Sequence, residues 1–363
     1  NTGDGLGMAL RAGIPLQDME FFQFHPTGIA GVGNLISEAA RGEGGFLVNR
    51  HGEHFMQRYA PATTDLASRD VVSRAILTEI RAGNGCGDQG DHVWLKLDHL
   101  GADKIKSRLP GIRDLARRFA HADPIDAPIP VFPTAHYMMG GIPSNRHGQV
   151  VAPTATGPEE AVPGLYAVGE CACVSVHGAN RLGGNSLLDI VVFGRAAGSH
   201  MLDYLRENPY PRPIPREATE FALARLARWE RSGQGESIPE IREAMRKIME
   251  DHCGVFRSSE GLRKGVEKMQ TLRERFSHAV LHDQSKIFNT ARIEALELEN
   301  MLQTALASMV SASARHESRG AHSQVDFPAR DDKNWLKHSL YFLEADRLDY
   351  KPVRLKPLTV ESF

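Results

Sequence analysis

The chain carries, at residues 177–189, the run His177-Gly178-Ala179-Asn180-Arg181-Leu182-Gly183-Gly184-Asn185-Ser186-Leu187-Leu188-Asp189. Three glycines, one arginine, two asparagines and a serine stand within it, and it passes directly into the apolar stretch Ile190–Phe193. This pattern predicts a backbone-rich loop that opens a buried helix. The N–H groups and the positive end of such a helix bind anions or carbonyl oxygens. The run therefore predicts an anion or nucleotide site, and a tight structural turn is the alternative.

A short strand is predicted just before this run. Residues 165–169, Leu-Tyr-Ala-Val-Gly, follow the turn Pro163-Gly164 and end at Glu170. A helix is predicted after the run, to about residue 205. Strand, loop and helix in this order are typical of a nucleotide-binding α/β unit.

Other segments predict further elements. Residues 1–12 read as a loop and then a helix with Thr2 or Asp4 as its cap, but the loop pattern G-D-G-L-G lacks the dinucleotide spacing G-x-G-x-x-G. Residues 69–80 have helical spacing, and prolines between 124 and 133 indicate a domain boundary. Residues 215–315 hold three amphipathic patterns, the last of which begins at Ile293, and they predict a helical bundle.

The composition excludes several classes of protein. Of the 363 residues, 41% are apolar and 24% charged, and the net charge is −2, so no general attraction to nucleic acid is expected. No apolar run approaches the roughly 18 residues of a membrane span. The four cysteines include a single C-x-C pair, at 171 and 173, which favours free thiols over a zinc site. We expect no metal site.

Polar residues gather in glycine-rich or apolar surroundings at four places besides the opening run. These clusters are residues 23–28 (QFHPTG), 37–45 (SEAARGEGG), 69–70 (RD) and 134–141 (TAHYMMGG). Each cluster alone also fits a structural role, such as a surface ion pair, a helix cap or a turn. Together, their histidines and arginines suit a small dicarboxylate, because arginine binds carboxylates through two parallel hydrogen bonds.

These motifs and their order resemble the succinate dehydrogenase/fumarate reductase flavoprotein family along essentially the whole chain. Eight ordered segments carry the resemblance: NTGDG (1–5), QFHPTG (23–28), SEAARGEGG (37–45), RDVV (69–72), TAHYMMGGIP (134–143), VGE (168–170), HGANRLGGNSLLD (177–189) and SRGAH followed by DFPxRDD (318–332).

The resemblance implies the fold class and the domain limits. It implies an α/β FAD-binding domain at residues 1–19 and 136–207, incomplete because its first βαβ unit is missing. An α+β capping domain is expected at residues 20–135, a helical domain at 208–325 and a short tail at 326–363.

The resemblance also implies the site residues. Those expected to contact a dicarboxylate are His25, Ser37, Glu38, His136 and Arg181. Arg69 is expected to carry the catalytic proton, which Glu38 and Arg41 relay to solvent, and Ser37 stands where the family commonly has threonine. The positions expected to contact FAD are Asp4, Glu170, Ser186 and Leu187.

The activity that the resemblance implies is the oxidation of succinate to fumarate. Electrons would pass through FAD to an iron–sulfur subunit and to quinone, within a respiratory complex II that includes membrane anchor subunits. The expected location is the cytoplasmic face of a bacterial inner membrane, or the mitochondrial matrix side, without a span of its own. Residues 183–189 and the pair Met138-Met139 favour succinate dehydrogenase over fumarate reductase or L-aspartate oxidase. A fragment that serves only as an assembly module is the non-enzymatic alternative.

The start of the chain at Asn1, inside a glycine-rich loop, leads us to expect a truncated chain. The family's glycine-rich fingerprint and the histidine that links covalently to FAD are expected upstream of Asn1. We therefore expect the 363-residue chain alone to bind FAD poorly and to be inactive.

Overall fold

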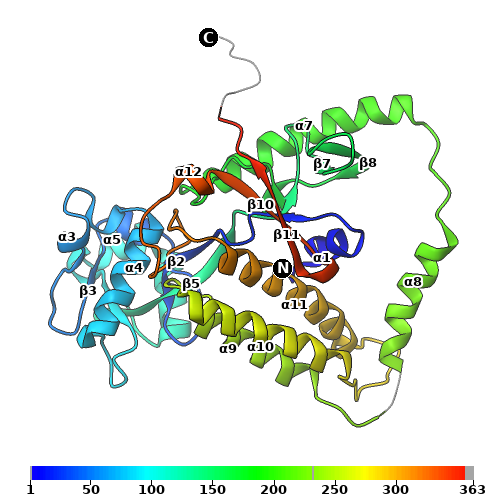
Figure 1. The fold of residues 1–363 in the computed structure, drawn as a ribbon. Coiled ribbons are helices and arrows are strands. Elements are labelled where there is room, and N and C mark those ends of the chain that lie inside the picture. The colour runs from blue at the N-terminus through cyan, green and yellow to red at the C-terminus, as the bar shows by residue number, and fades with distance from the viewer. Residues whose placement is uncertain (1, 231–232, 356–363) are drawn as a thin grey trace. The chain divides into compact units, whose positions relative to one another are not determined.

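The computed structural model describes residues 2–230 and 233–355 (Figure 1). Residue 1 of the first motif and residues 356–363 of the expected tail lie outside the described residues. The chain divides into two compact units. Residues 22–137 form the inserted unit, and the described residues on either side of it form the main unit. The inserted unit spans residues 22–137, and the expected domain limits, with the capping domain at 20–135 and further limits at 207 and 325, stay predictions.

The inserted unit is built on a four-stranded sheet with the order β2-β5-β4-β3. In β4, Val93 and Leu95 are buried while Trp94 and Lys96 are half-buried, the alternation expected of a strand with one face on a core. The pairings of β4 with β3 and β5 are antiparallel. The strand bounds are β2 (Phe22–Ile29), β3 (Phe46–Val48), β4 (Val93–Lys96) and β5 (Ile129–Met138).

Helices complete the core of the inserted unit. The helix predicted over 69–80 is confirmed as α4 (Arg69–Glu79), which buries Val72 and Ile76 completely. These two side chains pack with apolar residues of the sheet in one cluster. This packing holds α4, and with it Arg69 at its first position, against β2. The other helices are α2 (Ala39–Gly42), α3 (Met56–Tyr59), α5 (Ala102–Arg108) and α6 (Pro110–Leu115).

The main unit contains small sheets rather than one continuous sheet among its described residues. β1 (Leu16–Gln17), β10 (Lys337–Phe342) and β11 (Arg347–Pro352) pair in that order, and both pairings are antiparallel. Two further pairs are β6 (Ile142–Pro143) parallel to β9 (Ala172–Cys173), and β7 (Gln149–Ala152) antiparallel to β8 (Glu160–Tyr166).

The strand predicted over 165–169 is displaced in the structure. β8 ends at Tyr166; Ala167 N–H still donates across the hairpin to the Gly148 carbonyl at 2.9 Å, and Gly169, with φ of 74°, then begins a 3-10 turn. The apolar residues 167 and 168 therefore lead into the loop before α7 instead of extending the strand.

The helix after the opening run, α7 (Asn185–Glu207), begins where predicted but is not buried. Of its residues, all described, Asp189 and Ala197 are the buried ones, and Leu187 and Val191 are each 68% exposed. The expectation of a buried helix is wrong for this structure. The β7–β8 hairpin covers one side of α7, where the Tyr166 hydroxyl and His200 Nδ1 are 2.8 Å apart, and leaves the apolar side open.

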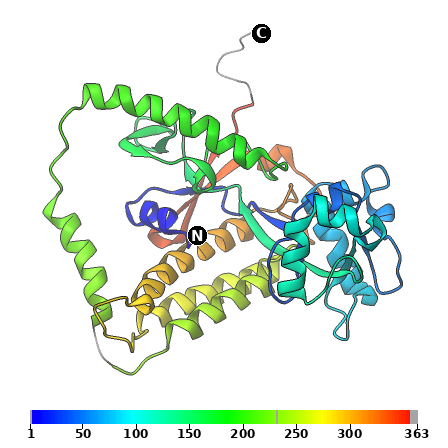
Figure 2. The same ribbon diagram turned by 180° about the vertical axis from the view of Figure 1, so that it is seen from behind.

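The predicted helical bundle is confirmed. α9 (Ile238–His252), α10 (Ser259–Ser277) and α11 (Thr290–Ala314) lie side by side in both views (Figures 1 and 2). Ile293, expected on the inner face of the third helix, is 56% exposed, because α11 turns Ala295 and Leu298 inward instead.

Three shorter helices complete the described part of the main unit. α1 (Asp4–Arg11) packs on α11, where Arg11 Nη1 donates to Asn300 Oδ1 at 2.7 Å. Its expected cap by Thr2 or Asp4 is wrong: Gly3, with φ of 73°, precedes the helix, and the Thr2 hydroxyl donates to the Asp4 carboxylate instead. The remaining helices are α8 (Arg216–Ala227) and α12 (Asp332–Trp335). None of the helices within residues 2–230 and 233–355 combines the length and apolar character that a membrane crossing requires.

Candidate functional site

A guanidinium and a carboxylate from distant parts of the sequence meet in the inserted unit. Arg69, the first residue of α4, directs Nε and Nη2 to the same Glu38 oxygen, each at 3.2 Å, and Nη1 to Gln23 Oε1 at 3.1 Å. The Arg69 side chain is 12% exposed and that of Glu38 is 38% exposed. Three donor nitrogens are thus held in place, and the cation faces a carboxylate that solvent reaches.

Two imidazoles lie close to each other on the strands of the same sheet. His25 on β2 and His136 on β5 have ring centroids 5.2 Å apart, with the planes at 78°. His25 is 2% exposed, and its Nδ1 accepts a hydrogen bond from Thr27 N–H at 3.3 Å, which leaves Nε2 as the position for a proton. Ser37 is exposed and directly precedes Glu38. The histidines therefore offer adjacent donors of the kind that a carboxylate accepts.

Arg41, three residues after Glu38, is buried. Its Nη1 donates to the carbonyl oxygen of Asp65, while Nε and Nη2 have no hydrogen-bond partner among the described residues. Burial lowers the pKa of the Arg41 guanidinium, and the charges of Glu38 and Asp65 act in the opposite direction. A buried arginine with unoccupied donors and a lowered pKa is suited to proton transfer.

The opening run forms a closed loop in the main unit. Its first and last residues, His177 and Asp189, are joined between Nε2 and Oδ2 at 2.8 Å, and both side chains are buried. The carbonyl of Ala179 accepts from Ala321 N–H at 2.9 Å. Arg181 is 5% exposed, and its Nη1 lies 3.4 Å from the Leu182 carbonyl. The loop is therefore held at its two ends by His177 and Asp189 and near its start by the Ala179 carbonyl.

The residues expected to contact flavin also lie in the main unit. Glu170 follows β8, and its Oε1 accepts from Met138 N–H at 3.0 Å. Ser186 and Leu187 stand in the first turn of α7, after Gly184 with φ of 80°. Asp4, at the start of α1, accepts from Asn300 Nδ2 at 2.7 Å.

These residues fit a flavin cofactor chemically. The exposed carboxylate of Glu170, in the 3-10 turn Gly169–Cys171, is of the kind that accepts from sugar or ribityl hydroxyls, and the first turn of a 23-residue helix presents N–H groups to a carbonyl oxygen. A Cβ at Gly169 would lie 2.8 Å from Ile190 Cγ2, so glycine is what lets the Glu170 turn approach α7 closely.

The expected site residues thus fall into two sets. His25, Ser37, Glu38, Arg41, Arg69 and His136 belong to the inserted unit, whereas Asp4, Glu170, Arg181, Ser186 and Leu187 belong to the main unit. The structure also shows partners that were not assigned from sequence. Gln23 is the first residue of the QFHPTG motif, but its contact with Arg69 spans 46 residues, and no local signal in the sequence reveals it. The contact between Asp65 and His54 likewise has no local signal in the sequence.

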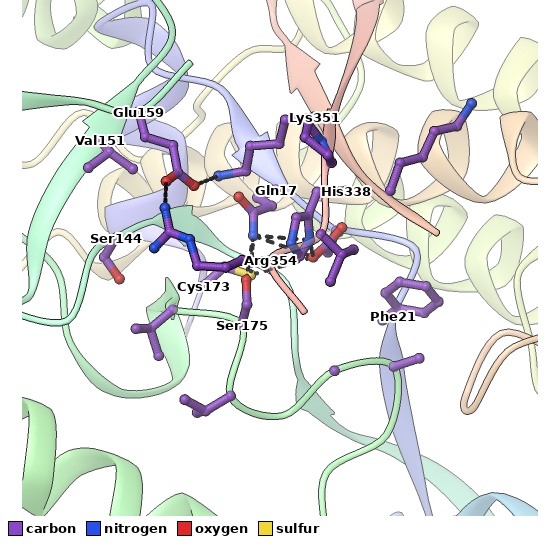
Figure 3. A pocket seen from close by; sticks show the side chains of 18 of the residues that line it. Gln17, Phe21, Ser144, Val151, Glu159, Cys173, Ser175, His338, Lys351 and Arg354 are labelled. Carbon is purple, nitrogen blue, oxygen red and sulfur yellow. Dashed lines mark hydrogen bonds and ion pairs between the residues drawn. The ribbon is translucent and has the colours of Figure 1, made fainter. Parts of the chain in front are cut away.

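A large cavity of about 1150 Å³ lies elsewhere in the main unit (Figure 3). In its wall, Gln17 Nε2 donates to the Ser175 hydroxyl at 2.9 Å, beside the buried thiol of Cys173. His338 Nδ1 lies 2.6 Å from the Asp18 carboxylate. None of the expected contact residues lines this cavity, so we do not assign the predicted chemistry to it. The described residues contain no cluster of histidine, cysteine and carboxylate side chains able to hold a metal ion.

Residues 1–187 match the family described as an FAD binding domain, and residues 242–362 match the C-terminal part of the fumarate reductase flavoprotein. The first match alone covers more than half of the chain. The chain belongs to the FAD-binding flavoproteins of the succinate dehydrogenase and fumarate reductase family. The family uses FAD, in agreement with the fit of the main-unit residues.

Individual relatives in this family are similar over the whole chain. The succinate dehydrogenase flavoprotein subunit of Coxiella burnetii is 54% identical over 363 residues, which are 100% of this chain and 62% of the relative. The fumarate reductase flavoprotein subunit of Mycobacterium tuberculosis is 43% identical and covers 98% of this chain and 62% of its own length. A solved E. coli quinol fumarate reductase is 41% identical, with a TM-score of 0.89, over 99% of this chain and 63% of its own. This chain therefore spans less than two thirds of the flavoproteins that it matches.

Proposed function

We propose that the flavoprotein to which this chain belongs oxidises succinate to fumarate. The observation that carries the proposal is the Arg69 guanidinium held against Glu38, in the same sheet-based unit as the adjacent imidazoles of His25 and His136. Cationic and imidazole donors suit the two carboxylates of a four-carbon substrate. The 54% identity to a succinate dehydrogenase subunit supports succinate as the substrate.

The residues would share the chemistry as follows. His25, His136 and Arg181 bind and orient the carboxylates. Bound FAD would supply the acceptor for a hydride from one carbon of the substrate. Arg69 accepts the proton from the neighbouring carbon, and it can do so only if its own proton moves to Glu38 and onward to Arg41. Without that exit the guanidinium remains fully protonated and cannot act as a base.

The same groups serve fumarate reduction when the proton and hydride move in reverse. The similarity to fumarate reductase flavoproteins keeps this reaction as the second candidate. L-Aspartate oxidation is a further alternative. Turnover with succinate and a quinone, with fumarate, or with aspartate and oxygen distinguishes the three.

We also propose the partners and the location. An iron–sulfur subunit would receive the electrons, and membrane anchor subunits would hold the complex at the cytoplasmic face of a bacterial inner membrane, or at the matrix side in mitochondria. The solved relatives named for their quinones or quinols support membrane electron carriers as the final partners.

The direct test needs the parts of the flavoprotein outside this chain. We define the reconstituted flavoprotein as the Coxiella burnetii subunit in which these 363 residues replace the matching region. Succinate-dependent reduction of an artificial dye by this protein is expected. Turnover of fumarate or aspartate without succinate turnover would contradict the proposal.

Replacement of Glu38 by glutamine tests the relay. Glutamine retains the polar contact with Arg69 but cannot accept its proton, so we expect kcat in the reconstituted flavoprotein to fall on the order of 10²-fold. Glu43→Gln is the matched control, because Glu43 lies on the same segment but pairs with Arg108 at 2.9 Å. Equal rates for Glu38→Gln and the parent protein would refute the relay.

The 363-residue chain by itself is expected to bind little FAD and to have no succinate–dye reductase activity. The reason is structural: α7 leaves Leu187, Leu188 and Val191 more than 60% exposed, so its apolar side lacks the packing that would hold a flavin-binding helix in place. The flavin content of the purified chain, measured from its absorbance, is expected to stay below about one FAD per ten chains. A yellow, active 363-residue chain would show this expectation to be wrong.

A further inference from the structure

The chain passes twice between the two compact units, and the two passages pair with each other. The first passage leaves the main unit at Phe21, and the second returns to it at Met138, the last residue of β5. Met139 N–H donates to the Phe21 carbonyl at 3.0 Å. Four residues before Phe21, Gln17 exchanges two backbone hydrogen bonds with Gly141, at 2.8 and 2.9 Å. The two passages are therefore joined through their main chains.

Buried cations of the main unit hold the first passage. Arg257, which is 1% exposed, donates through Nη1 to the carbonyl oxygen of Glu20 at 2.7 Å. Arg315, equally buried, donates to the Glu20 carboxylate at 2.6 Å and lies over the Phe21 ring. Both guanidinium groups lie inside the protein, so this anchor forms when the chain folds.

An exposed carboxylate holds the second passage. Glu170, in the 3-10 turn Gly169–Cys171, accepts through Oε1 from Met138 N–H at 3.0 Å. A carboxylate accepts hydrogen bonds through both of its oxygens, so one oxygen can hold Met138 while the other accepts from a flavin hydroxyl. The side chain that we expect to contact the flavin is therefore also bonded to the backbone two residues after His136.

We propose that Glu170 is a positioning residue that acts through His136. Under the proposed function, on which this inference rests, His136 binds a carboxylate of the substrate. The Glu170 carboxylate holds Met138 N–H, and with it the end of β5, which carries the His136 imidazole two residues earlier. Hydrogen bonds to a charged acceptor are about twice as strong as neutral ones, so this contact can fix the strand end. One side chain thereby serves both the flavin and the dicarboxylate.

Two substitutions of Glu170 separate this role from the negative charge. Glu170→Ala removes the acceptor for Met138 N–H, whereas Glu170→Gln keeps a carbonyl oxygen there and loses the charge. In the reconstituted flavoprotein, compared at matched flavin content, we expect Glu170→Ala to raise the KM for succinate about tenfold and to change kcat by less than about threefold. We expect Glu170→Gln to keep KM within about twofold of the parent value.

Asp203→Ala is the matched control. Asp203 is an exposed carboxylate of the same unit, on α7, and it pairs with Arg206 at 2.8 Å. Loss of this surface pair is expected to leave both KM and kcat at the parent values.

Action through His136 is tested by combining substitutions. His136→Ala is expected to raise the KM for succinate by itself. Glu170→Ala is expected to raise it no further in that background, because the imidazole that Glu170 positions is then absent. The dissociation constant of malonate, a dicarboxylate whose single central carbon offers no C–C bond to dehydrogenate, is expected to follow the same pattern and requires no turnover.

Amide hydrogen exchange measures the Met138 contact directly. Met138 N–H loses its acceptor in Glu170→Ala, so we expect it to exchange at least about tenfold faster than in the parent, whereas Glu170→Gln keeps the protection. Mass spectrometry of peptides that contain residue 138 gives this rate in the reconstituted flavoprotein with or without FAD. A variant that takes up no flavin is therefore still tested.

Four results would overturn the inference. They are an unchanged KM in Glu170→Ala, an equal rise in Glu170→Gln, KM increases that multiply in the double variant, and unchanged exchange at Met138. Any of these with an active parent protein leaves the proposed function standing. A parent that does not turn over succinate overturns both.

Discussion

The Arg69→Met variant of the reconstituted flavoprotein is expected to lose succinate oxidation almost completely, with kcat reduced on the order of 10³-fold or more. Methionine has a similar length but no exchangeable proton and no charge. The variant thus loses the group that accepts the proton from the substrate. Glu38 and Gln23 also lose the Arg69 N–H donors, which lie 3.2 Å and 3.1 Å from their oxygens. Arg69→Lys keeps the charge without the planar fork, so we expect it to remain strongly impaired.

Arg74 provides the control for this prediction. It lies on the same helix, α4, and pairs with Asp70 at 2.9 Å, with 31% of its side chain exposed. Arg74→Met is expected to change kcat by less than about threefold, because a local i,i+4 pair within one helix contributes only a few tenths of a kcal/mol. Steady-state succinate–dye assays at matched flavin content give the comparison. An Arg69→Met protein with more than about a tenth of the parent rate would exclude Arg69 as the proton carrier.

The spacing of apolar residues in the sequence predicted those helices that bury a single apolar face. α4, α9 and α10 were predicted from apolar spacing because each buries one face, whereas α11 buries consecutive residues from Ala305 to Met309. The register of α11 was not predicted correctly at Ile293, since alanine-rich turns allow more than one inward face. The strand near residue 165 was displaced because its residues serve a hairpin and then a loop.

The site was predicted in its residues but not in its contacts. The motifs identified Arg69 and Glu38, yet the distance between them depends on how α4 packs on the sheet. The resemblance to the family named Arg41, but its buried donors and its contact with Asp65 exist only after folding. His54 stands in an ordinary polar segment, and nothing in the spacing of that segment indicates a partner eleven residues away.

The second large effect is expected on stability. Arg315, just after α11, is 1% exposed and donates four hydrogen bonds: to Glu20 at 2.6 Å, to Glu317 at 2.9 Å and to the carbonyls of Trp335 and Lys337 at 2.8–2.9 Å. Burial alone would lower its pKa, but the two carboxylates, both fully buried, raise the pKa above its ordinary value. Arg315 is therefore a counter-charge for the buried Glu20, and it shares the buried Glu317 with Arg319.

Arg315→Met is expected to lower the free energy of unfolding by about 3–5 kcal/mol, because it removes the Arg315 counter-charge from the fully buried Glu20 carboxylate, whereas Glu317 keeps Arg319 at 2.7 Å. Arg263→Met is the control: its partner Glu267 lies at 2.6 Å, but both side chains are about 60% exposed, so the loss should stay within about 1 kcal/mol. Urea unfolding of the reconstituted flavoprotein, followed by circular dichroism and by fluorescence of Trp335, which lies 5.4 Å from the Arg315 guanidinium, measures both. Since whole domains are stable by only about 5–15 kcal/mol, Arg315→Met could also abolish soluble expression, which would agree with the prediction. Equal unfolding midpoints for the two variants would instead mean that water reaches Glu20 and Glu317 and solvates their charges.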